Sequence, residues 1–391
     1  MKKILYINLF LMFALATIIS CSGGSQSEIV IGNYGSLTGT TATFGISCKN
    51  GIEMATEKVN ARGGILSKPL KVIYEDTQGK AEEAAAVVQK LINQDDVAAV
   101  IGEIASSRSL AGAPICQRAM IPMITPASTN PEVTKKGDYI FRVCYMDDFQ
   151  GEVIARIAAE MLKVKTAAVL QDVKNDYSVG LAEFFTKEFE KRGGTVLVNE
   201  SYSEGDIDFR AQLTSIKNKN PQVLMVPGYY TEVGLVARQA RELGITFPIV
   251  GGDGWDSPRL IDIGREALEG AYFVTHFTDG DPDSLVQNFV KEYEAKYHEK
   301  PDAMAVLGYD AAMILYQAIR NAGSTGGPAL RDAIAATSGF KGVTGMITID
   351  ENRNANKPAV VVKVNGGKLQ FVQWMYPQSG SQSAEPVATK P

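Results

Sequence analysis

The sequence alternates short, almost wholly apolar runs with longer amphipathic segments. "EIVIGNYG", "PLKVIYED", "VAAVIGE" and "IPMIT" are the first four runs, and their length and composition are typical of buried strands. The segments between them, such as "KAEEAAAVVQKLINQ", carry apolar residues at helical spacing. This order predicts a parallel sheet with right-handed crossovers, which is an α/β fold.

The alternation starts again after "YIFRVCYMDD", near Asp147. The strand-like runs of the second set are "TAAVLQDV", "QVLMVPGYY", "FPIVGGD" and "AYFVTHF". Beyond Pro282, helix-like segments dominate until two final strand-like runs, which Asn365, Gly366 and Gly367 would join as a hairpin turn. The sequence therefore predicts two doubly wound parallel-sheet lobes.

The N-terminus has the features of an export signal. Two lysines precede an apolar run that ends in "TIISC", which resembles a bacterial lipobox, although serine before the cysteine is less usual. We expect a signal peptide over residues 1–20, lipidation of Cys21 and a flexible tether over residues 21–27. The alternative is an ordinary signal peptide with Cys21 as a bystander. Either way the protein would work in the periplasm or at the cell surface.

Composition narrows the class of function. The chain has 391 residues, of which 45% are hydrophobic and 21% charged, and its net charge of −5 argues against nucleic acid as a partner. It contains only two histidines, and Cys48, Cys116 and Cys144 form no C-x-x-C pair, so we expect small buried thiols. No G-x-S-x-G, P-loop or early G-x-G-x-x-G is present. We therefore expect no metal, no cofactor and no enzymatic activity.

The segments that follow the predicted strands differ between the two halves. Ligands of open parallel sheets bind beyond the carboxyl ends of the strands. In the first half these segments carry hydroxyl groups, which together with a helix N-terminus suit an anion. They are Ser106, Ser107, Ser128, Thr129 and the hydroxyls of residues 36–43. In the second half they carry aromatic rings and an acid, which suit a cation. They are Tyr177, Tyr229, Tyr230, Asp253 and Trp255.

A ligand with a carboxylate beside an ammonium group fits both halves, and an amino acid is such a ligand. Each residue also has a plain structural explanation, because serine and threonine cap helices and Asp-Gly marks turns. Trp255 either walls the pocket or packs behind it. In "VGGDGWDSP" we expect the glycines to let the backbone come close to the ligand.

Several motifs resemble the periplasmic leucine/isoleucine/valine-binding proteins, which are the branched-chain amino acid binding subunits of ABC importers. They are "VIGEIASSRS", "IPMITPASTNPEVT", "QDVKNDYSVG", "VPGYYTEVG" and "GGDGWDS", in family order between Glu28 and Tyr376. The resemblance implies a type I periplasmic-binding fold, with two lobes that close around a hinge. The implied first lobe comprises residues 28–147 and 276–347, and the second comprises 148–275 and 348–376. Residues 377–391 would be a disordered tail.

The resemblance also implies roles for individual residues. Ser106, Ser107, the backbone of Ala127 and Thr129 match the family's carboxylate-binding segments. Tyr177 and either Tyr229 or Tyr230 match aromatic residues of the second lobe, and Asp253 matches the acid that binds the ammonium group. The sequence departs from the family in four ways. Phe44 stands where a reference has tyrosine, Asp253 is shorter than glutamate, and Trp255 adds bulk. The family's disulfide-forming cysteine pair is absent, with Thr77 and Ala105 near those places.

These departures leave the ligand's side chain open. The resemblance implies a monomeric solute-binding protein that feeds ABC permease subunits, with an amino acid as its ligand, most plainly a branched-chain one. Small amides, urea or aromatic acids are alternative ligands. A sensory ligand-binding subunit is an alternative role, because it would use the same cleft.

Overall fold

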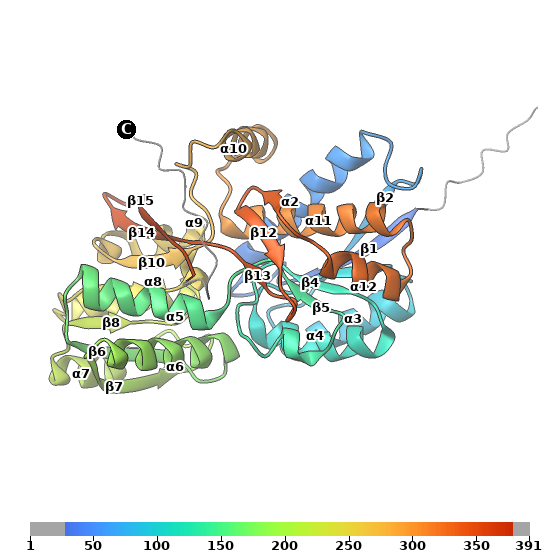
Figure 1. Ribbon diagram of the computed structural model, residues 1–391. Helices are drawn as coiled ribbons and strands as arrows, with labels where there is room; N and C mark the ends of the chain where they lie inside the picture. Colours follow the sequence, from blue (N-terminus) through green and yellow to red (C-terminus); the bar gives the residue numbers. More distant parts are fainter. Residues whose placement is uncertain (1–27, 378–391) are drawn as a thin grey trace, which may run out of the picture.

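The computed structural model describes residues 28–377, which form two lobes lying side by side (Figure 1). The predicted signal peptide, Cys21 with its tether, and residues 378–391 of the predicted tail lie outside the described residues. Between them, the two lobes bury most of the apolar side chains predicted to form strands and helices.

The first lobe is built on a five-stranded sheet in which every pair of neighbours is parallel. Its strands lie in the spatial order β2-β1-β3-β4-β5. Their bounds are β1 (Ile29–Gly35), β2 (Leu70–Asp76), β3 (Ala99–Gly102), β4 (Met123–Thr125) and β5 (Ile140–Arg142). All four residues of β3 are buried, as a central parallel strand requires.

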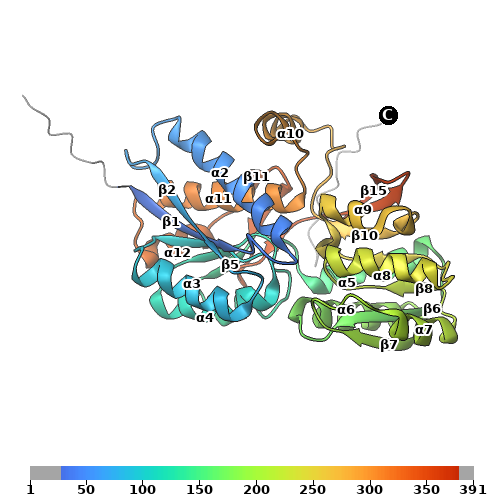
Figure 2. The same ribbon diagram turned by 180° about the vertical axis from the view of Figure 1, so that it is seen from behind.

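Helices cover both faces of this sheet, because each predicted crossover forms a helix (Figure 2). One face carries α3 (Ala81–Asn93) and α4 (Ser106–Ala119), which pack on each other. On the other face α2 (Ala42–Asn60) packs along α11 (Ala303–Ala322). The first lobe also contains α10 (Ser284–Tyr297), α12 (Gly327–Ala335) and a short 3₁₀ turn, Thr134–Lys136.

The second lobe is built on a seven-stranded sheet in the order β15-β14-β10-β9-β8-β6-β7. The strands are β6 (Thr166–Asp172), β7 (Thr195–Tyr202), β8 (Val223–Met225), β9 (Ile249–Gly251), β10 (Tyr272–Thr275), β14 (Ala359–Asn365) and β15 (Lys368–Met375). β6 to β10 pair in parallel, whereas β14 and β15 are antiparallel. The predicted hairpin is confirmed, because Gly366 and Gly367 connect β14 to β15 with positive φ angles.

Helices also flank the second sheet. They are α5 (Asp147–Arg156) with a π-helical extension (Ile157–Met161), α6 (Asp176–Lys191), α7 (Arg210–Lys219), α8 (Tyr230–Glu242) and α9 (Pro258–Gly264). Two short 3₁₀ turns, Asp253–Trp255 and Arg265–Leu268, flank α9. α5 packs against α6, and α8 packs against α9. The two doubly wound lobes predicted from the sequence are thus confirmed.

Three connections join the lobes: one after β5, one after β10 and one before β14. A small antiparallel sheet adjoins the last of them, with strands β11 (Phe340–Gly342), β12 (Gly345–Ile349) and β13 (Ala355–Asn356). Arg142 ties this sheet to the end of β5, because its Nε donates a hydrogen bond to Asn354 at 2.7 Å. The predicted boundary after residue 347 falls inside β12, and the predicted residue ranges of the lobes stay a prediction.

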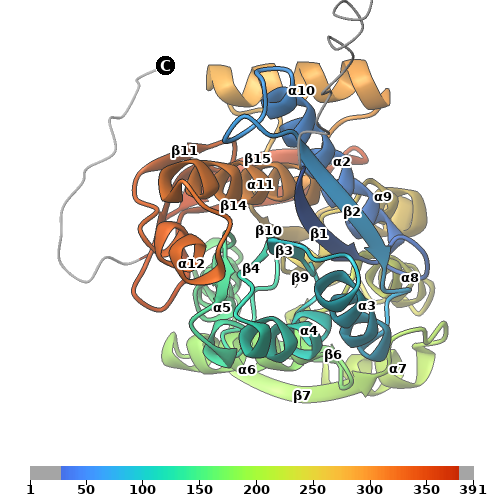
Figure 3. The same cartoon turned by 90° about the vertical axis from the view of Figure 1, so that its right-hand side faces the viewer.

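Both large sheets reverse their strand order beside their first strand. In the first lobe β2 and β3 lie on either side of β1, and in the second lobe β7 and β8 lie on either side of β6. Such switch points open a crevice at the carboxyl ends of the strands, where ligands of α/β proteins bind. Figure 3 looks along the molecule, with the first-lobe helices α3, α4 and α12 in front of the second lobe. Among residues 28–377, no helix has the length and apolar character needed to cross a membrane.

Candidate functional site

A small cavity lies between the carboxyl ends of the two sheets. The space open to a water-sized sphere there is about 10 Å³, room for about one water molecule, so the lining side chains already lie close together. Side chains of both lobes line it. They are Phe44, Ile104, Ser106, Ala127, Tyr177, Tyr229, Asp253, Gly254 and Met304. The cavity therefore marks the place where side chains of both lobes converge.

The first lobe presents hydrogen-bond donors to this cavity. Ser106 begins α4, and the residue before it has extended backbone, so the N–H groups of the first turn are free of helical partners. The Ser106 hydroxyl accepts a hydrogen bond from the backbone N–H of Asn130 at 3.2 Å. Its own proton therefore remains available for a ligand. Together these groups suit an anion, and a helix N-terminus adds a partial positive charge.

The second lobe contributes an aromatic wall. The rings of Tyr177 and Tyr229 are stacked with their centroids 5.5 Å apart, and Phe44 of the first lobe meets Tyr229 edge to face at the same distance. Burial, and then the charge of Asp253, raise the pKa of Tyr177 well above its usual value. Its hydroxyl accepts a hydrogen bond from the N–H of Gly254 at 3.1 Å, so the phenolic proton is free to be donated.

Asp253 begins the 3₁₀ turn that follows β9 and is only 3% exposed. Its backbone N–H donates to Gln150 Oε1 at 2.7 Å. Its Oδ2 lies 2.9 Å from His276 Nε2, whereas its buried Oδ1 has no partner. A buried carboxylate oxygen without a donor is costly, and an ammonium group in the cavity would remove that cost.

Unpaired buried polar atoms gather around this acid. Within residues 28–377, such side-chain atoms are Thr129 Oγ1, Tyr145 OH, Asp147 Oδ2, Asp253 Oδ1, His276 Nδ1 and Arg353 Nε. The first five belong to one connected group. Gln150 links Asp147 to Asp253, the Asp147 N–H donates to Thr129 O at 3.0 Å, and Tyr145 stacks on His276. This concentration distinguishes the crevice from the apolar core around it.

The connected set of unpaired atoms contains two carboxyl groups, those of Asp147 and Asp253, and the charge of one affects the other. Burial, and then the nearby charge of Asp253, raise the pKa of Asp147 well above its usual value. A raised pKa favours the protonated, neutral form of Asp147. The arrangement therefore accommodates a single negative charge on Asp253, which is the charge that one ammonium group would balance.

Most of the residues proposed from the sequence lie at the cavity. Phe44, Ser106, Ala127, Tyr177, Tyr229 and Asp253 line it, and Thr129 belongs to the adjoining group of unpaired atoms. Ser107 faces a different opening, where its hydroxyl accepts the N–H of Asp176 at 2.9 Å. Tyr230 packs edge to face on Phe44, with centroids 5.0 Å apart, and is not among the lining residues.

Trp255 packs behind the pocket and does not wall it. Its side chain is fully buried, its Nε1 donates to the carbonyl of Val226 at 3.0 Å, and its ring packs near Phe273. The glycines of this stretch also differ from expectation. A Cβ on Gly251 would lie 2.2 Å from the indole, and one on Gly252 would lie 2.2 Å from Gln150 Oε1. Side chains of the protein fill the space where a Cβ would lie at Gly251 and Gly252. The expectation that these two glycines let the backbone approach a ligand is therefore wrong.

Several residues at the site were not predicted from the sequence, and four of them have clear contacts there. His276 and Gln150 contact Asp253, and Ile104 and Met304 line the cavity. Ile104 lies inside the loop after β3, so its position was a usable signal. His276 follows directly on β10 and could have been found by the same rule. Nothing in the local sequence of Gln150 or Met304 marks them, because their helices reach the crevice through the tertiary fold.

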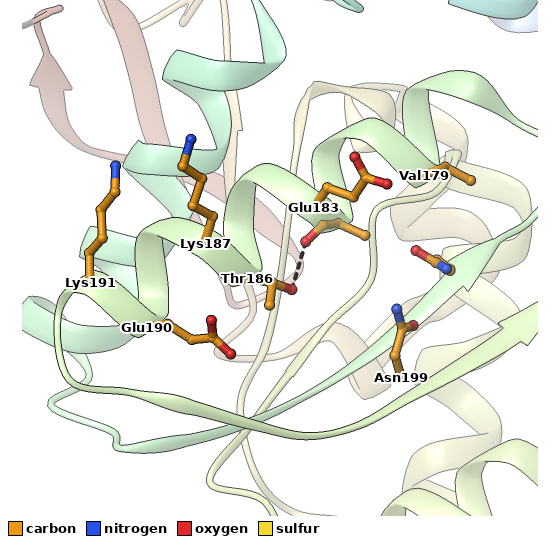
Figure 4. Close-up of a pocket in the computed structure, with 9 residues that line it drawn as sticks. Val179, Glu183, Thr186, Lys187, Glu190, Lys191 and Asn199 are labelled. Atoms are coloured by element: carbon orange, nitrogen blue, oxygen red, sulfur yellow. Dashed lines mark hydrogen bonds between the residues drawn. The ribbon is translucent and has the colours of Figure 1, made fainter.

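A second hollow, on the surface of the second lobe, lacks the unpaired polar atoms of the cavity. Figure 4 shows a groove along α6, lined by charged and polar side chains, in which Thr186 Oγ1 donates to the carbonyl of Ala182 within the same helix. The groove is open to solvent and is lined only by second-lobe residues.

Cys48, Cys116 and Cys144 are buried and unpaired, as predicted. Residues 28–377 contain no set of three or more acidic, histidine or cysteine side chains arranged for a metal ion.

Comparison with known proteins agrees with this architecture. A family profile described as periplasmic binding protein matches residues 28–368. A leucine-, isoleucine-, valine-, threonine- and alanine-binding protein of Pseudomonas aeruginosa is 31% identical over 345 residues, covering 88% of this chain and 91% of that protein.

Two solved structures are similar over nearly the whole described chain. A leucine-binding protein from Thermotoga maritima is 40% identical with a TM-score of 0.86, covering 89% of this chain and 99% of that one. A branched-chain amino acid transporter substrate-binding protein from Streptococcus pneumoniae, in complex with isoleucine, is 33% identical with a TM-score of 0.85, covering 90% and 100%. The resemblance noted in the sequence is confirmed. The chain belongs to the periplasmic binding protein family, as a type I binding protein of the branched-chain amino acid ABC transporter kind.

Proposed function

We propose that this protein binds a branched-chain or similar aliphatic α-amino acid between its lobes and presents it to an ABC permease. The observation that carries the proposal is that Asp253, whose Oδ1 has no partner, lines the same small cavity as Ser106 and Tyr177, whose hydroxyl protons are available. A cavity with an anion acceptor and neutral donors matches a zwitterion. An uncharged amide could donate a hydrogen bond to the acid but would not balance its charge, and a simple aromatic acid would bring no donor.

The remaining lining supports an aliphatic side chain. Phe44, Ile104 and Met304 are apolar, and Tyr229 is aromatic. In the proposed arrangement the ligand's carboxylate meets Ser106 and the N-terminus of α4, and its ammonium group meets Asp253 and the unpaired hydroxyl of Thr129. Each such charge-assisted hydrogen bond contributes about 1.5–3 kcal/mol.

The mechanism is a population shift and needs no catalytic step. A ligand that touches both lobes stabilises the closed arrangement, which a permease could then distinguish from the open one. The relatives are solute-binding proteins, and the location we propose is the periplasm or cell surface, with attachment through a lipid on Cys21. We further propose that the protein acts as a monomer.

Isothermal titration calorimetry tests the proposal with leucine, isoleucine and valine, beside 4-methylpentanoate, which lacks the ammonium group, and benzoate. We expect the amino acids to bind and the two acids to bind at least tenfold more weakly. Asp253→Asn should weaken leucine binding by about 30-fold or more, because leaving one charge of a buried pair unpaired costs roughly 2–5 kcal/mol.

Asp96→Asn is the matched control. Asp96 is exposed and has a positive φ that asparagine tolerates, so this variant should bind like the unaltered protein. Tight binding of benzoate or 4-methylpentanoate in place of leucine would overturn the amino-acid proposal. Uptake of labelled leucine by cells with and without the gene separates a transport role from a sensory one.

A further inference from the structure

His276 occupies a position that joins the candidate site to the connections between the lobes. It follows directly on β10, where the chain leaves the second-lobe sheet, and its side chain is fully buried. Its ring stacks on Tyr145, with centroids 3.7 Å apart and an interplanar angle of 22°. Tyr145 lies on the connection between β5 and α5. Two of the three connections between the lobes are therefore in contact beside Asp253, through the stacked rings of His276 and Tyr145.

The hydrogen bond between His276 and Asp253 determines which ring nitrogen carries the proton. A carboxylate only accepts hydrogen bonds, so Nε2, at 2.9 Å from Oδ2, must be the donor. Nδ1 has no partner among the described residues, as expected of the unprotonated nitrogen of a neutral ring. Burial lowers the pKa of His276 to about 4, although the charge of Asp253 acts in the opposite direction. A lowered pKa favours the neutral ring.

A neutral donor of this kind leaves the negative charge on Asp253 available. A protonated histidine would supply a competing cation at the same carboxylate. Lys357 lies on the third connection between the lobes, and its charge also lowers the pKa of His276. Burial lowers the pKa of Lys357 itself to about 8. Other titratable groups that interact with the acid are Asp147, Tyr177, Tyr145, Cys144 and Asp256. Burial is the largest cause for each and raises its pKa, which favours the neutral form.

The contact also constrains the direction of the carboxylate. Aspartate can rotate about its terminal torsion, which has broad energy wells. The bond from His276 fixes Oδ2, so that Oδ1, which has no partner, is the oxygen left for a ligand of the cavity that Asp253 lines. The stack on Tyr145 in turn limits where the imidazole can lie. Orientation of the acid therefore depends on the packing of two interlobe crossings.

We propose that His276 is a positioning residue for ligand binding: its Nε2–H holds Asp253 with one oxygen directed at the ligand's ammonium group and links that group to the hinge. This inference rests on the proposed amino-acid function. It extends that function by assigning a role to a residue that does not touch the ligand.

Two substitutions separate the hydrogen bond from the packing. His276→Phe keeps a ring against Tyr145 but removes the donor, whereas His276→Gln keeps an N–H near the position of Nε2 but loses the ring. By calorimetry we expect His276→Phe to weaken leucine binding about 10- to 100-fold, the usual effect of losing a hydrogen bond to a charged group. His276→Gln should remain within about threefold of the unaltered protein.

His298→Gln is the control, because His298 is the other histidine of the chain and is exposed. It should not change the affinity. It also identifies the His298 signal in nitrogen-15 spectra of the ligand-free protein, which leaves His276 as the remaining histidine. We expect its spectrum at pH 7 to show a protonated Nε2 and an unprotonated Nδ1. This measurement stands even if His276→Phe does not fold.

The outcomes are distinguishable. Failure of the unaltered protein to bind leucine, isoleucine or valine overturns the proposed function and this inference with it. Normal binding by the unaltered protein with equal binding by His276→Phe overturns the inference alone. The inference alone is also overturned if His276→Gln binds as weakly as His276→Phe, or if the proton lies on Nδ1.

Discussion

Glu232 shows how a single buried carboxyl group can couple stability to pH. It lies in the first turn of α8, is 2% exposed, and its Oε1 accepts the N–H of Gly205 at 3.0 Å. Burial raises its pKa from 4.5 to about 7, against the opposing effect of the Gly205 hydrogen bond. Between these two values the folded protein binds more protons than the unfolded chain. The contribution of Glu232 to stability therefore falls as pH rises from 4.5 to 7.

Replacing this residue by glutamine should remove that dependence. Glu232→Gln keeps the shape and the acceptor for Gly205 but cannot ionise. We expect the variant to gain stability over the unaltered protein as pH rises, by roughly 2 kcal/mol at pH 8 relative to pH 5. Urea unfolding at the two pH values measures it. The exposed Glu351→Gln should give the same difference at both, and a pH-independent effect of Glu232→Gln would contradict the argument.

The residues of the crevice could be predicted to different extents. Ser106, Tyr177 and Asp253 all follow the carboxyl ends of strands, so the general rule for parallel sheets finds them from the sequence alone. The same rule selects Trp255, whose indole instead turns back into the core to reach the carbonyl of Val226. The rule locates a loop, whereas the direction of each side chain depends on the space left by its neighbours.

At the scale of elements, one buried ion pair joins the ends of three first-lobe strands. Glu103, after β3, accepts hydrogen bonds from Ser36 after β1 at 3.2 Å and from Thr77 after β2 at 3.0 Å. Arg108 Nε lies 3.5 Å from Glu103 Oε1, and Arg108 Nη1 donates to Ser36 Oγ at 2.8 Å and to Thr41 Oγ1 at 3.0 Å. This network supports the loops that lead into α2 and α4, the helices that carry Phe44 and Ser106.

Arg108→Met should destabilise the protein strongly, because it leaves the Glu103 charge buried without a partner. Breaking a buried ion pair in this way costs about 3–5 kcal/mol. In urea unfolding the double variant Glu103→Gln with Arg108→Met should recover part of that loss, since the unpaired charge is removed. Arg62→Met, at an exposed position, should change stability little. A double variant no more stable than Arg108→Met would contradict the proposed cause.

The strand and helix pattern was predictable where elements are buried on both sides. β3 and β8 are short apolar runs flanked by helices, which is what the sequence shows. β7 and α7 were missed in the sequence. β7 is an edge strand whose exposed and half-buried residues alternate, and α7 buries only Leu213 and Ile216. Elements at the edge of a fold have too few apolar residues to stand out.

At the scale of the whole molecule, direct hydrogen bonds hold the lobes together at the rim of the crevice. Thr231 Oγ1 donates to the carbonyl of Thr40 at 2.8 Å, Thr40 Oγ1 donates to Glu204 at 3.1 Å, and the Asp176 N–H donates to Ser107. Neither Thr231 nor Thr40 lines the cavity. No local sequence pattern predicts such contacts, because they form only when two lobes far apart along the chain meet.

These rim contacts give a test of closure that leaves the cavity unchanged. Thr231→Val removes the bond to Thr40 with little change in shape, so it should disfavour the closed arrangement by about 0.5–1.5 kcal/mol. If ligand binds only the closed form, its apparent affinity falls in proportion to the population of that form, by about 2- to 10-fold. Calorimetry with leucine measures the loss, and stopped-flow measurements should show faster dissociation. Thr186→Val is the matched control, because its hydroxyl donates to a carbonyl within α6 (Figure 4). Equal effects of the two variants would mean that closure does not depend on the rim.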